Sequence, residues 1–158
     1  MNGFDESLFA HMEEIDYHWR CLLNGFEIYI QPKATIYHKG GYTLAYGSYQ
    51  KIYLNHRNSM ILFLTNNQNL SFLTICKRLL LEDITFIYYL LTGRLKAALA
   101  VITANLWWLF NIKYILKRKK RIKATIKSYH PISNELMVPY SIVRAYFYSK
   151  KKKFNKLD

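Results

Sequence analysis

The first segment of the chain carries apolar residues at every third or fourth position, which is the spacing of one helix face. These residues are Leu8, Met12, Ile15, Trp19, Leu22 and Leu23. The pair Asn24-Gly25 follows directly, and such a pair favours a left-handed cap at a helix end. The pattern therefore predicts one amphipathic helix that ends near residue 24.

Two short runs after this helix are predicted to be strands. Residues 27–30 are bounded by Pro32, and residues 34–37 lie shortly before Gly40-Gly41. Apolar β-branched and aromatic residues between Gly and Pro are typical of short strands.

Helical spacing returns further along the chain. Residues 49–64 are predicted to form a helix, and the polar residues 66–69 break it. Two uncharged runs follow, ten residues at 84–93 and sixteen at 97–112. Because a membrane-spanning helix needs roughly 20 apolar residues, both runs favour helices that lie in a membrane interface or pack on a core.

The net charge of +13 is concentrated in the second part of the chain. Residues 1–92 hold seven Lys or Arg and eight Asp or Glu, whereas residues 93–158 hold sixteen and two. A field of this sign attracts nucleic acid or an anionic membrane. Trp107 and Trp108 precede six cations within 117–123, and tryptophan is favoured at the level of lipid headgroups. The alternative is that the apolar runs pack on a core and the cations form a solvated face.

Composition limits the class of protein. With 158 residues, of which 51% are hydrophobic and 21% charged, the chain suits one domain and is too apolar to be disordered. Cys21 and Cys76 form neither a disulfide framework nor a metal cluster by spacing. This favours a reducing, cytoplasmic setting. The first residues lack a basic and apolar leader, so no signal peptide is expected.

Acidic residues gather in the first predicted helix. Glu13 and Asp16 are three apart and Asp16 and Arg20 four apart, so each pair shares a helix face. One interpretation is a solvated helix start whose acids complement the helix dipole, with a weak surface ion pair. The other is a general base beside a second carboxylate and an arginine.

Two further groups are ambiguous. His38, at a predicted strand end beside Gly40-Gly41, is either a polar loop residue or a ligand for a metal or phosphate. Arg57-Asn58, on a predicted helix, suits either a surface ion pair or a bidentate phosphate contact.

An ordered set of motifs runs through roughly residues 2–65. It consists of Gly3-Phe4-Asp5-Glu6, Phe9, Glu13-Glu14-Ile15-Asp16, Trp19-Arg20, Gly25-Phe26, Ile28-Tyr29, Pro32, Tyr37-His38-Lys39-Gly40-Gly41, Tyr53-Leu54 and Arg57-Asn58. This set resembles the last part of the catalytic domain of family 2 glycosyltransferases. The family's GT-A fold implies an α/β fragment, mainly helical: the acceptor-side helix and two short strands, followed by long amphipathic helices.

The resemblance also implies a division of the chain and a set of site residues. Residues 1–66 are the C-terminal part of a catalytic domain, 67–125 a membrane-associating helical region, and 126–158 a basic, partly disordered tail. The motif Glu-Asp-x-Asp-x-x-x-Arg places the catalytic base on Glu14, with Glu13 and Asp16 as further catalytic acids. The implied substrate-binding residues are Arg20, His38, Gly40, Gly41 and Arg57, and His38 is also a candidate metal ligand.

The function implied is transfer of a sugar from a nucleotide-diphosphate sugar, with Mg²⁺ or Mn²⁺, to a cell-surface polysaccharide or lipid-linked acceptor. The expected location is peripheral, at the inner face of the cell membrane, against an anionic surface. No Asp-x-Asp metal motif occurs in the sequence, so the chain is expected to be a C-terminal portion that is inactive alone. The alternatives are a non-enzymatic peripheral membrane protein or gene relic, and a basic nucleic-acid-binding protein. No nucleic-acid partner is expected, because no recognition motif is present.

Overall fold

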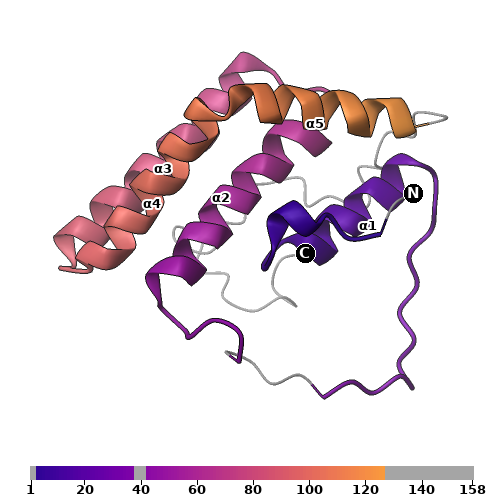
Figure 1. Ribbon diagram of the computed structural model, residues 1–158, viewed down its shortest axis with the longest axis horizontal. Coiled ribbons are helices and arrows are strands. Elements are labelled where there is room, and N and C mark those ends of the chain that lie inside the picture. The colour runs from indigo at the N-terminus through magenta and orange to yellow at the C-terminus, as the bar shows by residue number, and fades with distance from the viewer. Residues whose placement is uncertain (1–2, 38–41, 127–158) are drawn as a thin grey trace, which may run out of the picture.

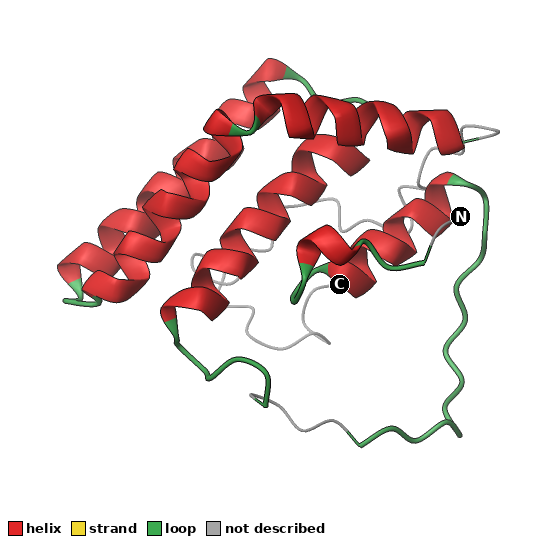
Figure 2. Ribbon diagram, in the orientation of Figure 1, coloured by secondary structure: helices red, strands yellow, loops and turns green. Residues whose placement is uncertain are grey.

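The computed structural model describes residues 3–37 and 42–126, in which helices are joined by loops (Figures 1 and 2). The helices are the short 3₁₀ helix η1 (Glu6–Leu8), α1 (Glu13–Leu23), α2 (Tyr49–Asn66), α3 (Phe72–Leu91), α4 (Leu95–Phe110) and α5 (Ile112–Thr125). Figure 1 shows α3 and α4 side by side as a hairpin, with α2 next to α4. The chain bends by 71° between α4 and α5, and α5 then extends past α2 towards α1.

Local signals set the ends of the central helices. The Ser48 hydroxyl accepts a hydrogen bond from the Lys51 backbone N–H at 3.3 Å, and the Ser71 hydroxyl accepts one from the Thr74 backbone N–H at 3.2 Å. These two serines cap the starts of α2 and α3. Gly93 has a φ of 69° in the turn between α3 and α4, a left-handed conformation that favours glycine. The predicted helix at 49–64 is confirmed by α2.

Small residues let α4 pack closely in the bundle. Its buried face consists of Ala97, Ala98, Ala100, Val101 and Ala104, none more than 4% exposed. The distance between packed helices depends on side-chain size at the contact, so alanines permit a close approach. A second buried cluster joins η1, α2 and α5, and its members are Leu8, Met60, Ile61, Leu62, Leu64 and Ile115.

The two predicted strands are not formed. The described residues contain no strand, and residues 26–37 run as a long loop after α1 (Figure 2). Ile30 and Tyr37 are 90% and 95% exposed. A strand is stabilised by backbone hydrogen bonds to a neighbouring strand, and the described part of the chain offers this segment none. The prediction of an α/β fragment with two strands is therefore wrong, and the described chain is helical.

The first predicted helix is observed only in its second half. Phe9, His11 and Met12 have φ values of 61°, 67° and 70°, and these left-handed conformations are incompatible with a continuous α-helix. The apolar spacing from Leu8 onwards therefore spans a loop as well as α1.

A buried acid holds α3 against α2. Glu82 on α3 is 1% exposed, and its Oε2 lies 2.6 Å from Nδ1 of His56 on α2. Arg78, one turn earlier on α3, forms an ion pair with Glu82 and donates to the Ser59 hydroxyl at 2.7 Å. Burial raises the pKa of Glu82, but the His56 hydrogen bond and the charges of His56 and Arg78 outweigh it and hold this pKa below its ordinary value of 4.5.

We predict that Glu82 makes the stability depend on pH. Because its pKa is lower in the folded state, its contribution is present above the unfolded pKa and is lost as the pH falls through the folded value. Urea unfolding from about pH 7 to about pH 3 should show this loss, and Glu82→Gln should flatten it. The exposed Asp83→Asn is the matched control; an equal flattening there would contradict the prediction.

Candidate functional site

A buried arginine connects the start of the chain to α1, α2 and α5. Arg118 on α5 is 2% exposed. Its Nε donates to Asp5 Oδ2 at 3.0 Å, and its Nη2 donates to Asp16 Oδ1 at 2.7 Å. Its Nη1 donates to Asn66 Oδ1 at 2.9 Å and also to the Thr65 hydroxyl. One guanidinium therefore joins segments that lie more than 100 residues apart in the sequence.

Asp16 is fully buried and bound through both carboxylate oxygens. Besides Arg118, its Oδ1 accepts a hydrogen bond from Asn66 Nδ2 at 2.8 Å, and its Oδ2 accepts one from Arg20 Nε at 2.9 Å. Arg20 Nη2 also donates to the Gly3 carbonyl at 2.8 Å. A buried carboxylate requires this degree of pairing. Of the predicted catalytic acids, Asp16 is thus the one held inside the fold.

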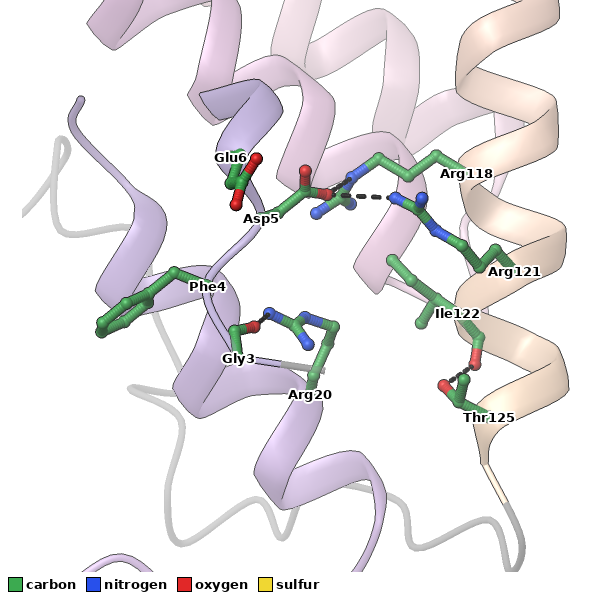
Figure 3. Close-up of a pocket in the computed structure, with 9 residues that line it drawn as sticks. All are labelled: Gly3, Phe4, Asp5, Glu6, Arg20, Arg118, Arg121, Ile122 and Thr125. Carbon is green, nitrogen blue, oxygen red and sulfur yellow. Dashed lines mark hydrogen bonds and ion pairs between the residues drawn. The ribbon is translucent and has the colours of Figure 1, made fainter. Parts of the chain in front are cut away.

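Asp5 lines an open cavity between the start of the chain and α5 (Figure 3). The cavity has a volume of about 300 Å³, and its lining consists of Gly3, Phe4, Asp5, Glu6, Arg20, Arg118, Arg121, Ile122 and Thr125. Figure 3 shows the Arg118 and Arg121 guanidinium groups converging on Asp5, with Arg121 Nη2 at 3.2 Å. Partial burial raises the pKa of Asp5, but hydrogen bonds from Ser7 and the charge of Arg118 bring it below the ordinary value.

The loop before α1 is held by the Asn58 side chain. Asn58 on α2 is fully buried. Its Nδ2 donates to the carbonyl oxygens of Leu8, Ala10 and His11 at 2.8, 2.8 and 2.9 Å. Its neighbour Arg57 donates to the Ser7 carbonyl at 3.0 Å and to Asn58 Oδ1 at 2.9 Å. These bonds offset the strain of the left-handed backbone and fix where α1 begins.

Besides Asp16, two further carboxylates lie in the first turn of α1. Glu13 is half-buried, and its Oε2 is enclosed without a hydrogen-bond partner among the described residues. Glu14 is exposed. The first turn of α1 therefore presents a solvent-accessible carboxylate at Glu14, at a helix end that favours negative charge. Such a group can accept a proton from a hydroxyl that approaches from solvent.

Of the predicted substrate-binding residues, the structure describes Arg20 and Arg57. His38, Gly40 and Gly41 lie outside the described residues. Arg57 is directed at the backbone before α1 and lies over the Tyr53 ring, 5.6 Å from its centre, so it is occupied within the fold. Over the ranges 3–37 and 42–126, no group of three His, Cys, Asp or Glu could hold a metal.

Arg118 was not singled out in the sequence, where it is one of six cations in 117–123. The signal that distinguishes it is its spacing from Ile115 and Ile122, at three and four residues. Both isoleucines are buried, at 3% and 4% exposure. The three residues share one face of α5, which is the face turned towards α2 and the start of the chain.

Comparisons with protein-family models, curated proteins and solved structures find no significant match to this chain. The structure nevertheless brings several residues of the ordered motif set into one contact network. Asp5, Asp16 and Arg20 meet around Arg118, and Arg57 and Asn58 fix the loop that leads into α1. Function is therefore inferred from the chain's own residues.

We predict that Arg118→Gln lowers the free energy of unfolding by roughly 3–5 kcal/mol, because it leaves the buried Asp16 without its closest cation. Arg121→Gln is the matched control: Arg121 pairs with Asp5, but its side chain is 63% exposed, so its loss should cost less than about 1 kcal/mol. Urea denaturation followed by circular dichroism measures both. Equal losses in the two variants would contradict the central position given to Arg118.

Proposed function

We propose that the chain is the acceptor-side, C-terminal part of a family 2 glycosyltransferase, in which Glu14 is the general base. The supporting observation is that two acids of α1, Asp16 and Glu14, differ in burial and in hydrogen bonding. Asp16 is buried and bound by Arg20, Asn66 and Arg118. Glu14 is exposed at the start of the same helix, so the network fixes the helix while the neighbouring carboxylate remains free to react.

The proposed step is proton removal from an acceptor hydroxyl. A Glu14 oxygen takes the proton while the hydroxyl oxygen forms a bond to the anomeric carbon of the sugar. The bond from that carbon to the nucleoside diphosphate breaks, and the diphosphate leaves with the bonding electron pair. General-base catalysis of this kind contributes roughly 10²–10⁴-fold to a rate. The acceptor we propose is a glycan or a lipid-linked molecule at the inner face of the cell membrane.

The described residues do not fit the expected Mg²⁺ or Mn²⁺. No metal-binding group of three is found among them, and Asp5 and Asp16 already bind arginines. The motif Asp-x-Asp is absent from the sequence. We therefore assign no step to a metal, and we propose that another part of the transferase binds the donor.

The competing function is a non-enzymatic peripheral membrane protein. In that case the Asp16–Arg118 network stabilises the fold, and Glu14 is a solvated residue at a helix start. The apolar surface of α3 and α4 suits this alternative equally well. Only Glu14 separates the two functions, because its exposed carboxylate has no role in the second.

We predict that Glu14→Gln lowers turnover by roughly 10²–10⁴-fold, because an amide cannot accept the proton. The test uses a chimaera in which residues 1–158 replace the matching C-terminal part of a family 2 glycosyltransferase of known activity. The donor KM should remain nearly unchanged. Glu27→Gln is the matched control, since Glu27 is exposed and lies outside α1.

Near-normal turnover in Glu14→Gln would remove this residue from the role. A correctly folded chimaera that transfers no sugar would contradict the proposal as a whole.

We also predict that the 158-residue chain alone neither transfers sugar nor binds a nucleotide-diphosphate sugar tightly. The physical reason is the missing Asp-x-Asp motif and the pairing of Asp5 and Asp16 with arginines. Calorimetry with nucleotide-diphosphate sugars, with and without Mg²⁺ or Mn²⁺, measures this. Micromolar binding that depends on the metal would overturn the assignment of donor binding to another part of the protein.

A further inference from the structure

Helix α3 exposes an apolar face along most of its length. The face consists of Leu73, Leu80, Ile84, Ile87 and Leu91, each more than half exposed. Their spacings of three, four and seven residues place them on one side of the helix. The opposite side carries Glu82, which is buried against α2. The apolar face therefore points away from the rest of the bundle.

Helix α4 likewise has one buried side and one exposed apolar side. Its alanine-rich side is buried, whereas Leu95, Leu99, Leu106, Leu109 and Phe110 are between 42% and 83% exposed. These residues also recur at helical spacing. Monomeric soluble proteins rarely expose contiguous apolar patches larger than a few hundred Å². The exposed leucine-rich faces of these two neighbouring helices thus indicate a surface that binds an apolar partner.

The charge of the same region indicates what covers this apolar surface. Residues 84–126 contain nine Lys or Arg and no Asp or Glu. On α5, Arg118 is turned inward, whereas Lys117, Lys120 and Lys123 are exposed. Leu116 on the same helix is 60% exposed beside them. The surface therefore combines aliphatic side chains with cations that lack acidic partners nearby in the sequence.

We propose that the α3–α4 hairpin and the exposed face of α5 form a docking surface for an anionic lipid bilayer. The leucines enter the boundary between headgroups and acyl chains, and the exposed lysines contact lipid phosphates. A nucleic acid would suit the cations but leave the aliphatic faces of both hairpin helices uncovered.

The hairpin lies in the interface with its axes along the bilayer surface. Arg94 in its turn and Lys96 at the start of α4 are both exposed, and a cation is costly in the centre of a bilayer. Among the described residues, no single helix has the length and apolar character to cross a membrane; α4 and α5 meet the criterion only as a pair, bent by 71°. This docking does not depend on the proposed sugar transfer, because it rests on α3 to α5 alone.

The test is co-sedimentation of the full chain with vesicles of phosphatidylcholine, alone or mixed equally with phosphatidylglycerol. We expect binding that requires phosphatidylglycerol and weakens with salt. The double variant Lys120→Gln with Lys123→Gln should bind roughly 30-fold more weakly, because each lysine near an anionic surface contributes about fivefold. Lys33→Gln with Lys51→Gln removes the same charge elsewhere and should bind nearly normally.

The contribution of the apolar side chains to vesicle binding is tested with a second double variant and a matched control. Leu91→Asn with Phe110→Asn changes two side chains that are both 83% exposed, and should weaken binding at least roughly tenfold. Ile36→Asn with Tyr37→Asn, at 87% and 95% exposure, is the control and should leave binding unchanged.

Circular dichroism confirms that each variant keeps its helices. Binding that is equal for neutral and anionic vesicles, that is absent from both, or that falls as much in the control variants would overturn the proposal.

Discussion

The ion pair between Asp16 and Arg118 is the interaction on which the arrangement of the helices depends. Both side chains are at most 2% exposed, so neither charge has water to stabilise it if the other is lost. The pair lies 102 residues apart in sequence and fastens α5 to α1, while Asn66 of α2 binds both partners. The position of Glu14 at the start of α1 follows from this anchor.

In helices α4 and α5, the buried side and the exposed side carry different types of residue. In α4, alanines face the bundle and leucines face away from it. In α5, Arg118 between two isoleucines faces inward, whereas Lys117, Lys120 and Lys123 are exposed. One side of these helices stabilises the fold, and the other side is available to a partner. Trp107 and Trp108, residues of a type favoured at lipid headgroups, are partly buried against the cluster formed by η1, α2 and α5.

The failed prediction of strands has a clear physical origin. Residues 27–30 and 34–37 have the apolar character of strands, but a strand is stabilised by its neighbour and not by its own sequence alone. Likewise, the left-handed backbone at Phe9, His11 and Met12 depends on Asn58, which lies nearly fifty residues away. Neither outcome is visible in the local pattern of the chain.

The sequence by itself predicted α2, and its apolar runs at 84–93 and 97–112 overlap α3 and α4, because helical spacing acts over a few residues. The spacing did not predict the start of α3 at Phe72 or helix α5. The sequence also identified the acids of α1, and the motif set pointed to Arg57 and Asn58. Only the tertiary structure decided that Asp16 is buried and hydrogen-bonded to Arg118, and that Glu14 is exposed. It also decided which of the six cations in 117–123 is buried, namely Arg118. The physical reason is that burial of a charge depends on partners brought together from distant parts of the chain, and a local pattern contains no information about them.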